Sequence, residues 1–289
     1  MKILNHLIIF LFKFRILYTF QHIINVNHIR NKIKEKYSLH KNLGYNKSRK
    51  ILFNQLNDNI IYGHKNSIKN IKQLNCEHIW CQKYFDYKEP MKSDLHIMYI
   101  SNSKLNSHRQ DYKFSDITSN FVIINNNGTI IDKNIFNQFL NNHLYKKNSK
   151  KKIFEPAIKS KGKISRSIAY YHLIYNDINE NITENFNEHK KNNSNIEKII
   201  DNKYLLEWNR KYLPNIDEIQ RNEIIRLNQE NINPFIKYPI LLEILYNEKI
   251  NSKYIIKLGF YTIFTIILSD LFKFNYKLKK ILFTFNYDC

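Results

Sequence analysis

Residues 75–109 constrain the fold more than any other segment, because they predict a strand, a loop, a second strand and a helix in direct succession. Leu74–Ile79 alternates apolar and polar residues over a length typical of a strand, and Leu95–Ile100 is the strongest strand candidate in the chain. Ser101 supplies a hydroxyl that can cap a helix running to Arg109. The segment therefore predicts a short sheet followed by a helix.

Four side chains of this segment carry chemistry. Glu77 and His78 are neighbours at the end of the first strand, and Asn106 and Arg109 share a face of the helix because they are three residues apart. Hydrolysis of a phosphodiester requires a base for water, oxygen ligands for a hard cation and a positive charge near the phosphate. The segment contains all the residue types that this reaction needs.

The chain is strongly basic, with 46 Lys and Arg against 25 Asp and Glu and a formal net charge of +21. A heavy general use of Asn, Lys and Ile accounts for part of this excess. A surface with this charge attracts polyanions over long distances. The charge alone does not distinguish a protein that binds nucleic acid from one with a lysine-rich surface that only water contacts. Together with the candidate site, it favours nucleic acid as the partner.

The three cysteines, Cys76, Cys81 and Cys289, make neither a disulfide framework nor a CxxC pair. Because Cys76 and Cys81 flank the Glu77–His78 pair, a zinc site is one alternative. Four ligands at suitable spacing are missing, so a small buried side chain on a strand is favoured for Cys76.

The remainder of the chain predicts mainly helices. Gly (5) and Pro (5) are scarce, so few turns are forced and long helices are easy to accommodate. Apolar spacing predicts helices at residues 29–43, 48–56, 164–175, 204–212 and 216–229, the third preceded by a break at Gly162, and a short strand at Ile60–Tyr62. Residues 125–152 predict a long loop with an amphipathic stretch around 135–144, and residues 176–202 a low-complexity insertion that is disordered or poorly packed.

Both ends of the chain are apolar and basic. Residues 1–25 have the outline of a signal or anchor, although Lys13 and Arg15 interrupt the apolar run and no cleavage site follows. In the tail, residues 251–289, the uncharged run Leu258–Ser269 is shorter than the ~18–20 residues of a spanning helix, and the lysines after it suit an anionic lipid surface. Localisation stays open: secreted or membrane-associated if residues 1–25 act as a signal, and otherwise intracellular.

Three blocks of the sequence are similar to one known family. They are NCEHIWCQKYF…MKSDLHIMYISNSKLNSHR, FEPAIKSKGKISRSIAYYHLIY and LLEWNRKYLPNIDEIQRNEIIRLNQENINPFIKYP. In this order and spacing they resemble the endonuclease I family of His-Me finger (ββα-metal) nucleases. The resemblance implies an α+β, mostly helical fold with a small antiparallel sheet and a ββα-metal core, and a catalytic domain over residues 26–250.

The resemblance also implies roles for the four side chains. His78 would be the general base, and Glu77 and Asn106 the two protein ligands of one Mg²⁺, with Ca²⁺ or Mn²⁺ as substitutes. Arg109 would lie near the phosphate. In some relatives an arginine in the loop after the base contacts phosphate, and this chain offers only lysines there, namely Lys83, Lys88 and Lys92.

Further residues match positions around the family's site. Asp94 and His96 match an Asp-Leu-His segment that braces the strand and the site. Arg166 matches a basic position near the phosphate, although its place on a helix face favours a structural role. For Arg109, an ion pair with Asp94 or Asp111 is an equally open alternative.

The predicted function follows from these roles. We expect a monomeric, Mg²⁺-dependent endonuclease whose substrate is DNA, with RNA as a second candidate, and whose product carries a 5′-phosphate. Cleavage should be independent of sequence, because contacts to phosphates carry little base information. The alternative is a catalytically degenerate nuclease fold that acts as a basic nucleic-acid-binding protein. Membrane association of the termini is a further open expectation.

Overall fold

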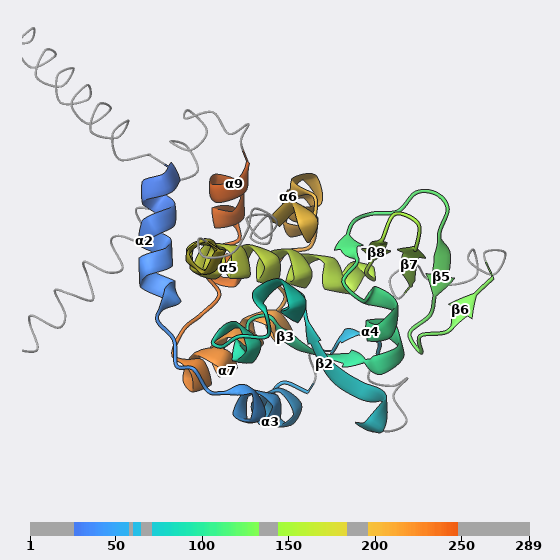
Figure 1. Cartoon of the computed structure of the whole chain (residues 1–289), viewed down its shortest axis with the longest axis horizontal. Coiled ribbons are helices and arrows are strands. Elements are labelled where there is room, and N and C mark those ends of the chain that lie inside the picture. The colour runs from blue at the N-terminus through green and yellow to red at the C-terminus, as the bar shows by residue number, and fades with distance from the viewer. Residues whose placement is uncertain (1–25, 58–59, 65–70, 133–143, 184–195, 248–289) are drawn as a thin grey trace, which may run out of the picture. The chain divides into compact units, whose positions relative to one another are not determined.

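The computed structural model describes residues 26–57, 60–64, 71–132, 144–183 and 196–247 (Figure 1). The chain divides into two units, one formed by Arg30–Tyr246 and the other by Met1–Ile29 together with Asn247–Cys289. The predicted signal or anchor and the predicted C-terminal tail lie outside the described residues. Within the described residues, no helix combines the length and the apolar character needed to cross a membrane.

The longest elements of the described part of the chain are helices, and all of them except the first turn of α2 belong to the larger unit. They are α2 (Val26–Ser38), α3 (Tyr45–Gln55), α4 (Ser103–Arg109), α5 (Ile158–Thr183), α6 (Asn202–Lys211), α7 (Ile216–Gln229), α8 (Pro234–Lys237) and α9 (Ile240–Tyr246). The predictions for α6 and α7 are confirmed, and Asn215 caps α7 by accepting a hydrogen bond from the backbone N–H of Glu218. The first predicted helix was too long, since α2 ends at Ser38 and Leu43 lies outside it.

A three-stranded sheet contains the strands of the candidate site. Its strands are β1 (Ile60–Tyr62), β2 (Leu74–His78) and β3 (Met98–Asn102), with β3 in the centre. β2 runs antiparallel to β3, but β1 runs parallel to it, so the expected antiparallel sheet is in fact mixed. β3 begins three residues later than predicted, because Leu95–Ile97 form a turn in which the Ile97 N–H donates to the carbonyl of Asp94.

A second sheet was not predicted. It has the order β4-β8-β7-β5-β6 and consists of β4 (Lys113–Phe114), β5 (Val122–Ile124), β6 (Ile130–Ile131), β7 (Tyr145–Asn148) and β8 (Ile153–Glu155). The prediction of a loop over residues 125–152 was therefore wrong, because strands this short show no clear alternation in the sequence. The stretch predicted around residues 135–144 lies outside the described residues except for Leu144.

Helix α5 runs without interruption through Gly162, where a break was predicted. A Cβ atom at this position would lie 2.2 Å from the carbonyl oxygen of Tyr212 and 2.9 Å from Nη2 of Arg166. The glycine therefore permits a close approach between α5 and the end of α6. α5 also extends to Thr183, into the predicted insertion, of which residues 184–195 lie outside the described part of the chain.

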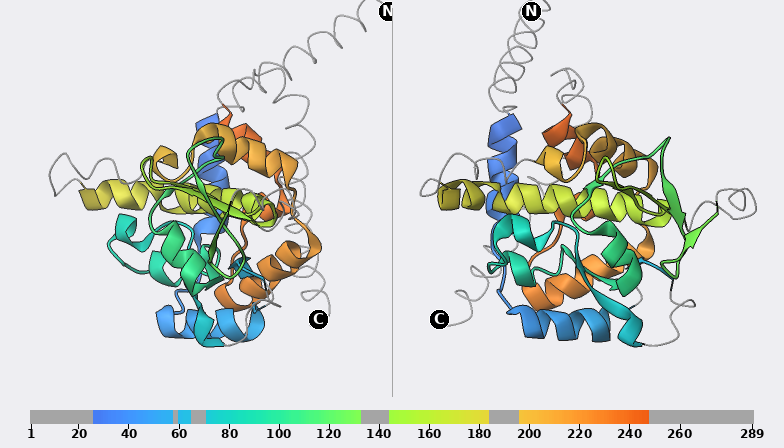
Figure 2. Two further views of the ribbon diagram at one scale, coloured as in Figure 1. Left: turned by 90° about the vertical axis from the view of Figure 1, so that its right-hand side faces the viewer. Right: turned by 45° about the vertical axis from the view of Figure 1, so that its right-hand side comes forward.

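The hydrophobic core fixes the site's strands against helices on one side of α5. α3 and α7 lie on one side of α5, and α6 and α9 on the other (Figures 1 and 2). Side chains of α3, α7, β3 and the turn before β3 pack into one cluster: Ile51, Leu52, Leu56, Leu95, Met98, Ile100 and Ile225. Two residues after the end of β2, the indole of Trp80 stacks on Tyr171 of α5, with ring centroids 4.3 Å apart.

Candidate active site

Strand β3 passes directly into α4, and this junction sets where the helical site residues lie. The side-chain oxygen of Asn102 accepts hydrogen bonds from the backbone N–H groups of Lys104 (3.0 Å) and Leu105 (3.2 Å) and so caps the helix. The predicted cap, Ser101, instead lies within β3, because the strand continues two residues further than expected. Asn106 then follows one turn into α4.

Asn106, Glu77 and Arg109 come together where α4 packs on β2. The Nδ2 atom of Asn106 donates to Oδ1 of Asn75 (3.1 Å) and to the carbonyl oxygen of Cys76 (3.5 Å), and the Asn106 side chain lies close enough to the Glu77 carboxylate to lower its pKa. Glu77 Oε1 accepts a hydrogen bond from the hydroxyl of Tyr62 at 3.2 Å and lies 3.4 Å from Nε of Arg109. Three of the four predicted site residues thus meet in one cluster.

The Glu77 carboxyl group is buried, with 4% of the residue exposed. Burial raises its pKa to about 7, although Arg109 and hydrogen bonds from Tyr62, the His78 backbone and Asn106 all lower it. The protein therefore neutralises this carboxylate only in part. Binding of a further cation would favour its charged form.

The donor atoms present fit a magnesium ion. Carboxylate and carboxamide oxygens are ligands that Mg²⁺ accepts, and it commonly takes one or two protein ligands and completes its shell with waters and a substrate phosphate. Glu77 offers a carboxylate, and Asn106 offers a carboxamide oxygen that accepts no hydrogen bond from any described residue. Within the described residues, no group of three or more His, Cys, Asp and Glu side chains is placed to hold a metal.

The His78 imidazole is held at both ring nitrogens. Nε2 lies 2.9 Å from the carbonyl oxygen of Lys92, and Nδ1 lies 3.1 Å from Nε2 of Gln82. Tyr45 stacks against the ring, with centroids 6.3 Å apart and planes inclined by 24°. Burial lowers the pKa of His78 to about 4, so the ring is neutral near pH 7.

The structure does not join the His78 ring to the other site residues. Neighbouring residues of a strand point to opposite faces. Accordingly, Glu77 contacts Tyr62 and Arg109, whereas His78 contacts Gln82 and Lys92. The imidazole makes no hydrogen bond to the side chain of Glu77 or Asn106.

Arg109 lies inside the protein, with 2% of the residue exposed. Nη2 donates to the carbonyl oxygen of Ile79 and Nη1 to that of Gln110, each at 2.7 Å, and the guanidinium lies 4.7 Å from the centroid of the Phe114 ring. Its carboxylate partner is Glu77, so the alternative partners Asp94 and Asp111 were wrong.

Asp94 organises the turn that leads into β3. Its Oδ1 accepts hydrogen bonds from the His96 backbone N–H and from Nε2 of Gln229, and its Oδ2 accepts from the hydroxyls of Tyr170 and Tyr175. These partners belong to α5, to α7 and to the turn itself, which links three parts of the fold. Asp94 therefore fixes the turn before β3, and the hydrogen bonds of its carboxylate include none to Glu77 or Asn106.

A model of the endonuclease I family matches residues 21–240. The chain belongs to the endonuclease I family. No curated protein matches the sequence. As a member of this family the protein is an endonuclease, that is, a phosphodiester hydrolase, and its substrate is nucleic acid.

Two other predicted residues of this endonuclease have no role in the Glu77 cluster. Arg166 makes a bidentate salt bridge with Glu218 at 2.6 and 2.7 Å and so joins α5 to α7. The His96 ring stacks obliquely on Tyr170, with centroids 4.6 Å apart, and its two nitrogens are buried without a hydrogen-bond partner of good geometry. Burial lowers the pKa of His96 to about 4, so it packs as a neutral ring.

One residue that fixes the site, Arg221, lies in the third block of the family resemblance. Arg221 of α7 donates from Nη2 to the carbonyl oxygens of Leu95 and Met98, at 2.5 and 2.7 Å, and its guanidinium lies 4.1 Å from the centroid of the Tyr99 ring. It therefore holds the turn before β3 against α7. No local sequence signal marks this role, because the partners lie more than a hundred residues away.

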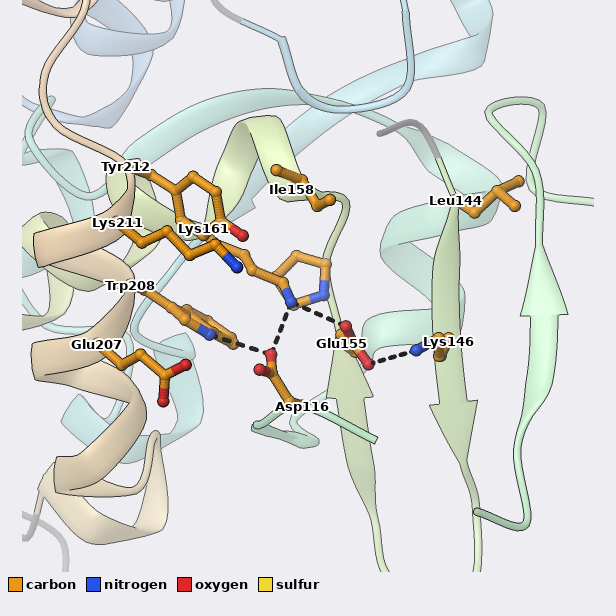
Figure 3. Close-up of a pocket in the computed structure, with 11 residues that line it drawn as sticks. Asp116, Leu144, Lys146, Glu155, Ile158, Lys161, Glu207, Trp208, Lys211 and Tyr212 are labelled. Atoms are coloured by element: carbon orange, nitrogen blue, oxygen red, sulfur yellow. Dashed lines mark hydrogen bonds and ion pairs between the residues drawn. The ribbon is translucent and has the colours of Figure 1, made fainter. Parts of the chain in front are cut away.

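The endonuclease also contains a polar pocket of about 220 Å³ between β7, β8, α5 and α6 (Figure 3). Nζ of Lys161 donates to Asp116 (2.6 Å) and Glu155 (2.8 Å), and the indole N–H of Trp208 donates to Asp116 (3.0 Å). None of the predicted site residues lines this pocket. Its central charges neutralise each other, so we assign it no ligand.

Proposed function

We propose that the protein is a Mg²⁺-dependent endonuclease of DNA whose site lies at β2 and α4. β2, β3 and α4 would be its ββα-metal core. The observation that supports this proposal most strongly is the meeting of Glu77 and Asn106, two oxygen-bearing side chains about thirty residues apart, beside a strand that ends in a neutral histidine. The substrate phosphate would bind at the end of β2, where Glu77 and His78 are neighbours.

Glu77 and Asn106 would hold the metal ion, and Arg109 would position Glu77 from inside the protein. When bound, Mg²⁺ would stabilise the negative charge that develops on the phosphate and on the leaving 3′ oxygen. Arg109 cannot contact the phosphate without leaving the Ile79 and Gln110 carbonyls, so its role is to fix the carboxylate. Hydrolysis in this manner leaves a 5′-phosphate.

His78 would act as the general base. A carbonyl oxygen only accepts hydrogen bonds, so the contact with Lys92 requires the ring proton on Nε2 and leaves Nδ1 as the basic nitrogen. Nδ1 would take a proton from the attacking water once the Gln82 amide has moved away from it. We further propose that cleavage is independent of base sequence and that the protein acts as a monomer, with RNA as a second substrate.

Nicking of a supercoiled plasmid by the purified full-length protein tests this proposal. We expect nicking with Mg²⁺ and none with EDTA, and 5′-phosphate ends that accept ligation. His78→Ala should lower the rate by about 10²–10⁴-fold, the range typical of a general base, with unchanged DNA binding and unfolding. His108→Ala, which changes a histidine on α4 that hydrogen-bonds to Gly128, is the matched control.

Each outcome bears on a separate part of the proposal. Unchanged nicking by His78→Ala would remove the base assignment, and full activity in EDTA would remove the metal. Binding of DNA by the wild-type protein without any cleavage would favour the alternative, a degenerate nuclease fold that binds nucleic acid.

A further inference from the structure

The burial of Arg109 removes from the proposed site the cation that the family resemblance placed near the phosphate. Its guanidinium forms an ion pair with Glu77 and donates hydrogen bonds to the carbonyls of Ile79 and Gln110. In the loop after His78, Lys83 is paired with Asp111 and Lys88 lies 4.0 Å from Asp86. A phosphate that approaches His78 must therefore find its positive charge elsewhere.

Lys92 supplies one such positive charge, and its backbone carbonyl is hydrogen-bonded to the His78 ring. Its carbonyl oxygen accepts the hydrogen bond from His78 Nε2 at 2.9 Å, while its ammonium group lies 5.2 Å from the centroid of the Tyr45 ring. Tyr45 in turn stacks against His78. Tyr45 therefore holds the Lys92 ammonium beside the imidazole through a cation–π contact.

Arg49 is the second charge, and it lies on the same face of α3 as Tyr45, one turn later. Its side chain is exposed, and the guanidinium lies 4.9 Å from the centroid of the Phe53 ring. Its charge acts on the Tyr45 hydroxyl and on the Cys76 thiol of β2, two residues before His78. Arg49 thus lies one turn of α3 from Tyr45, the residue that contacts both His78 and Lys92.

Neither cation is neutralised by a described carboxylate. α3 contains no acidic residue, and no ion pair joins Arg49 or Lys92 to any residue that the structure describes. This distinguishes them from Lys161, Arg166 and Arg210, which form ion pairs with Asp or Glu. Their positive charge remains available to a ligand.

We propose that Tyr45, Arg49 and Lys92 form a phosphate-binding surface, the α3–η4 surface, that holds the backbone of a nucleic-acid strand alongside His78. Here η4 is the short helix Met91–Ser93, which packs against α3. Arg49 and Lys92 contact successive phosphates, and Tyr45 positions Lys92. The inference rests on the proposed function for its ligand, but it concerns binding and needs no chemical step.

Binding of a fluorescein-labelled DNA duplex, measured by anisotropy in EDTA at several salt concentrations, tests this surface. Arg49→Gln and Lys92→Gln remove one charge each and leave the Lys92 carbonyl in place. Each lost contact to duplex phosphate should reduce the slope of log K against log salt by about 0.9. Both variants should therefore bind more weakly at low salt, and Arg49→Lys should retain the wild-type slope.

Lys203→Gln is the matched control, because Lys203 is exposed and its ammonium lies 5.3 Å from the centroid of the Tyr204 ring on α6. α6 lies on the other side of α5 from α3 (Figures 1 and 2). We expect this variant to keep the wild-type affinity and slope. Wild-type slopes in both Arg49→Gln and Lys92→Gln would overturn the inference, as would a loss of slope in Lys203→Gln equal to theirs.

The experiment separates this inference from the proposed function. If the wild-type protein binds DNA with the expected slopes but cleaves nothing, the surface stands and the catalytic proposal fails. If the wild-type protein nicks plasmid and both Arg49→Gln and Lys92→Gln keep the wild-type slope of log K against log salt, the catalytic proposal stands and the surface fails. Equal unfolding midpoints for all variants exclude a loss of fold as the cause.

Discussion

The Nε2 atom of His78 lies 2.9 Å from the main-chain carbonyl oxygen of Lys92. Because this partner is a backbone atom, no single side-chain substitution removes it, and the loop between β2 and β3 fixes the tautomer of the ring. The same loop supplies Gln82, whose amide covers the remaining nitrogen at 3.1 Å. The proposed base is thus oriented at one nitrogen and covered at the other.

Removal of the Gln82 amide should expose the basic nitrogen of His78. We expect Gln82→Ala to raise the rate at which diethyl pyrocarbonate modifies His78 by several-fold. An unprotonated ring nitrogen attacks this reagent, and in the wild-type protein the Gln82 amide covers that nitrogen. Mass spectrometry of the His78 peptide measures the rate, and the His172 peptide is the internal control. An unchanged rate at His78 would show that Gln82 does not cover Nδ1 in solution.

The Arg166–Glu218 pair should contribute strongly to stability. Both side chains are 1% exposed, so Arg166→Met leaves a buried carboxylate without its partner. We expect a loss of about 3–5 kcal/mol in the free energy of unfolding, measured with urea. Arg226→Met is the control, because its pair with Glu223 is exposed, and it should unfold like the wild-type protein. Equal effects of the two substitutions would contradict the prediction.

Glu230 should be a site where glycine stabilises the protein. It ends α7 with φ at +73°, in the left-handed region that disfavours side chains and commonly holds glycine at this position. We expect Glu230→Gly to raise the free energy of unfolding by up to about 1 kcal/mol. Glu230→Ala loses the same ion pair with Lys41 but keeps the strained backbone, so it should not stabilise. A higher free energy of unfolding in the alanine variant would show that the loss of the Glu230 charge, and not relief of the backbone, causes the stabilisation.

Asp94 should make stability depend on acid pH. Burial raises the pKa of Asp94, but the neighbouring imidazoles of His96 and His40 and hydrogen bonds from Tyr175 and Gln229 lower it by more, so the pKa lies below its ordinary value. Stability from such a group is present above the unfolded pKa of ~3.9 and is lost as pH falls through the lower folded pKa. The stability advantage of the wild type over Asp94→Asn should therefore narrow below about pH 4 in urea unfolding. A constant difference from pH 7 to pH 3 would contradict this.

The elements that could be predicted are those whose signal lies within a few residues. α7 has a cap at Asn215 and steady apolar spacing, and β2 has clear alternation, so both were placed closely. The five strands of the second sheet were missed because none is longer than four residues, and because two of its pairings, β4 with β8 and β5 with β7, join strands that are distant in sequence. Gly162 was misread as a break because the neighbour that requires it, Tyr212, is fifty residues away.

The sequence by itself determined the family and the residue types of the site, since three ordered blocks and the Glu77, His78, Asn106 and Arg109 pattern are local properties of the chain. Only the tertiary structure decided where these side chains lie. It placed Arg109 inside the protein against Glu77, and it turned His78 toward Lys92 and Gln82. The physical reason is that burial and partner choice depend on which distant segments pack around β2. α4 packs on β2 beside Glu77, whereas Tyr45 of α3 and the loop to β3 contact the His78 ring.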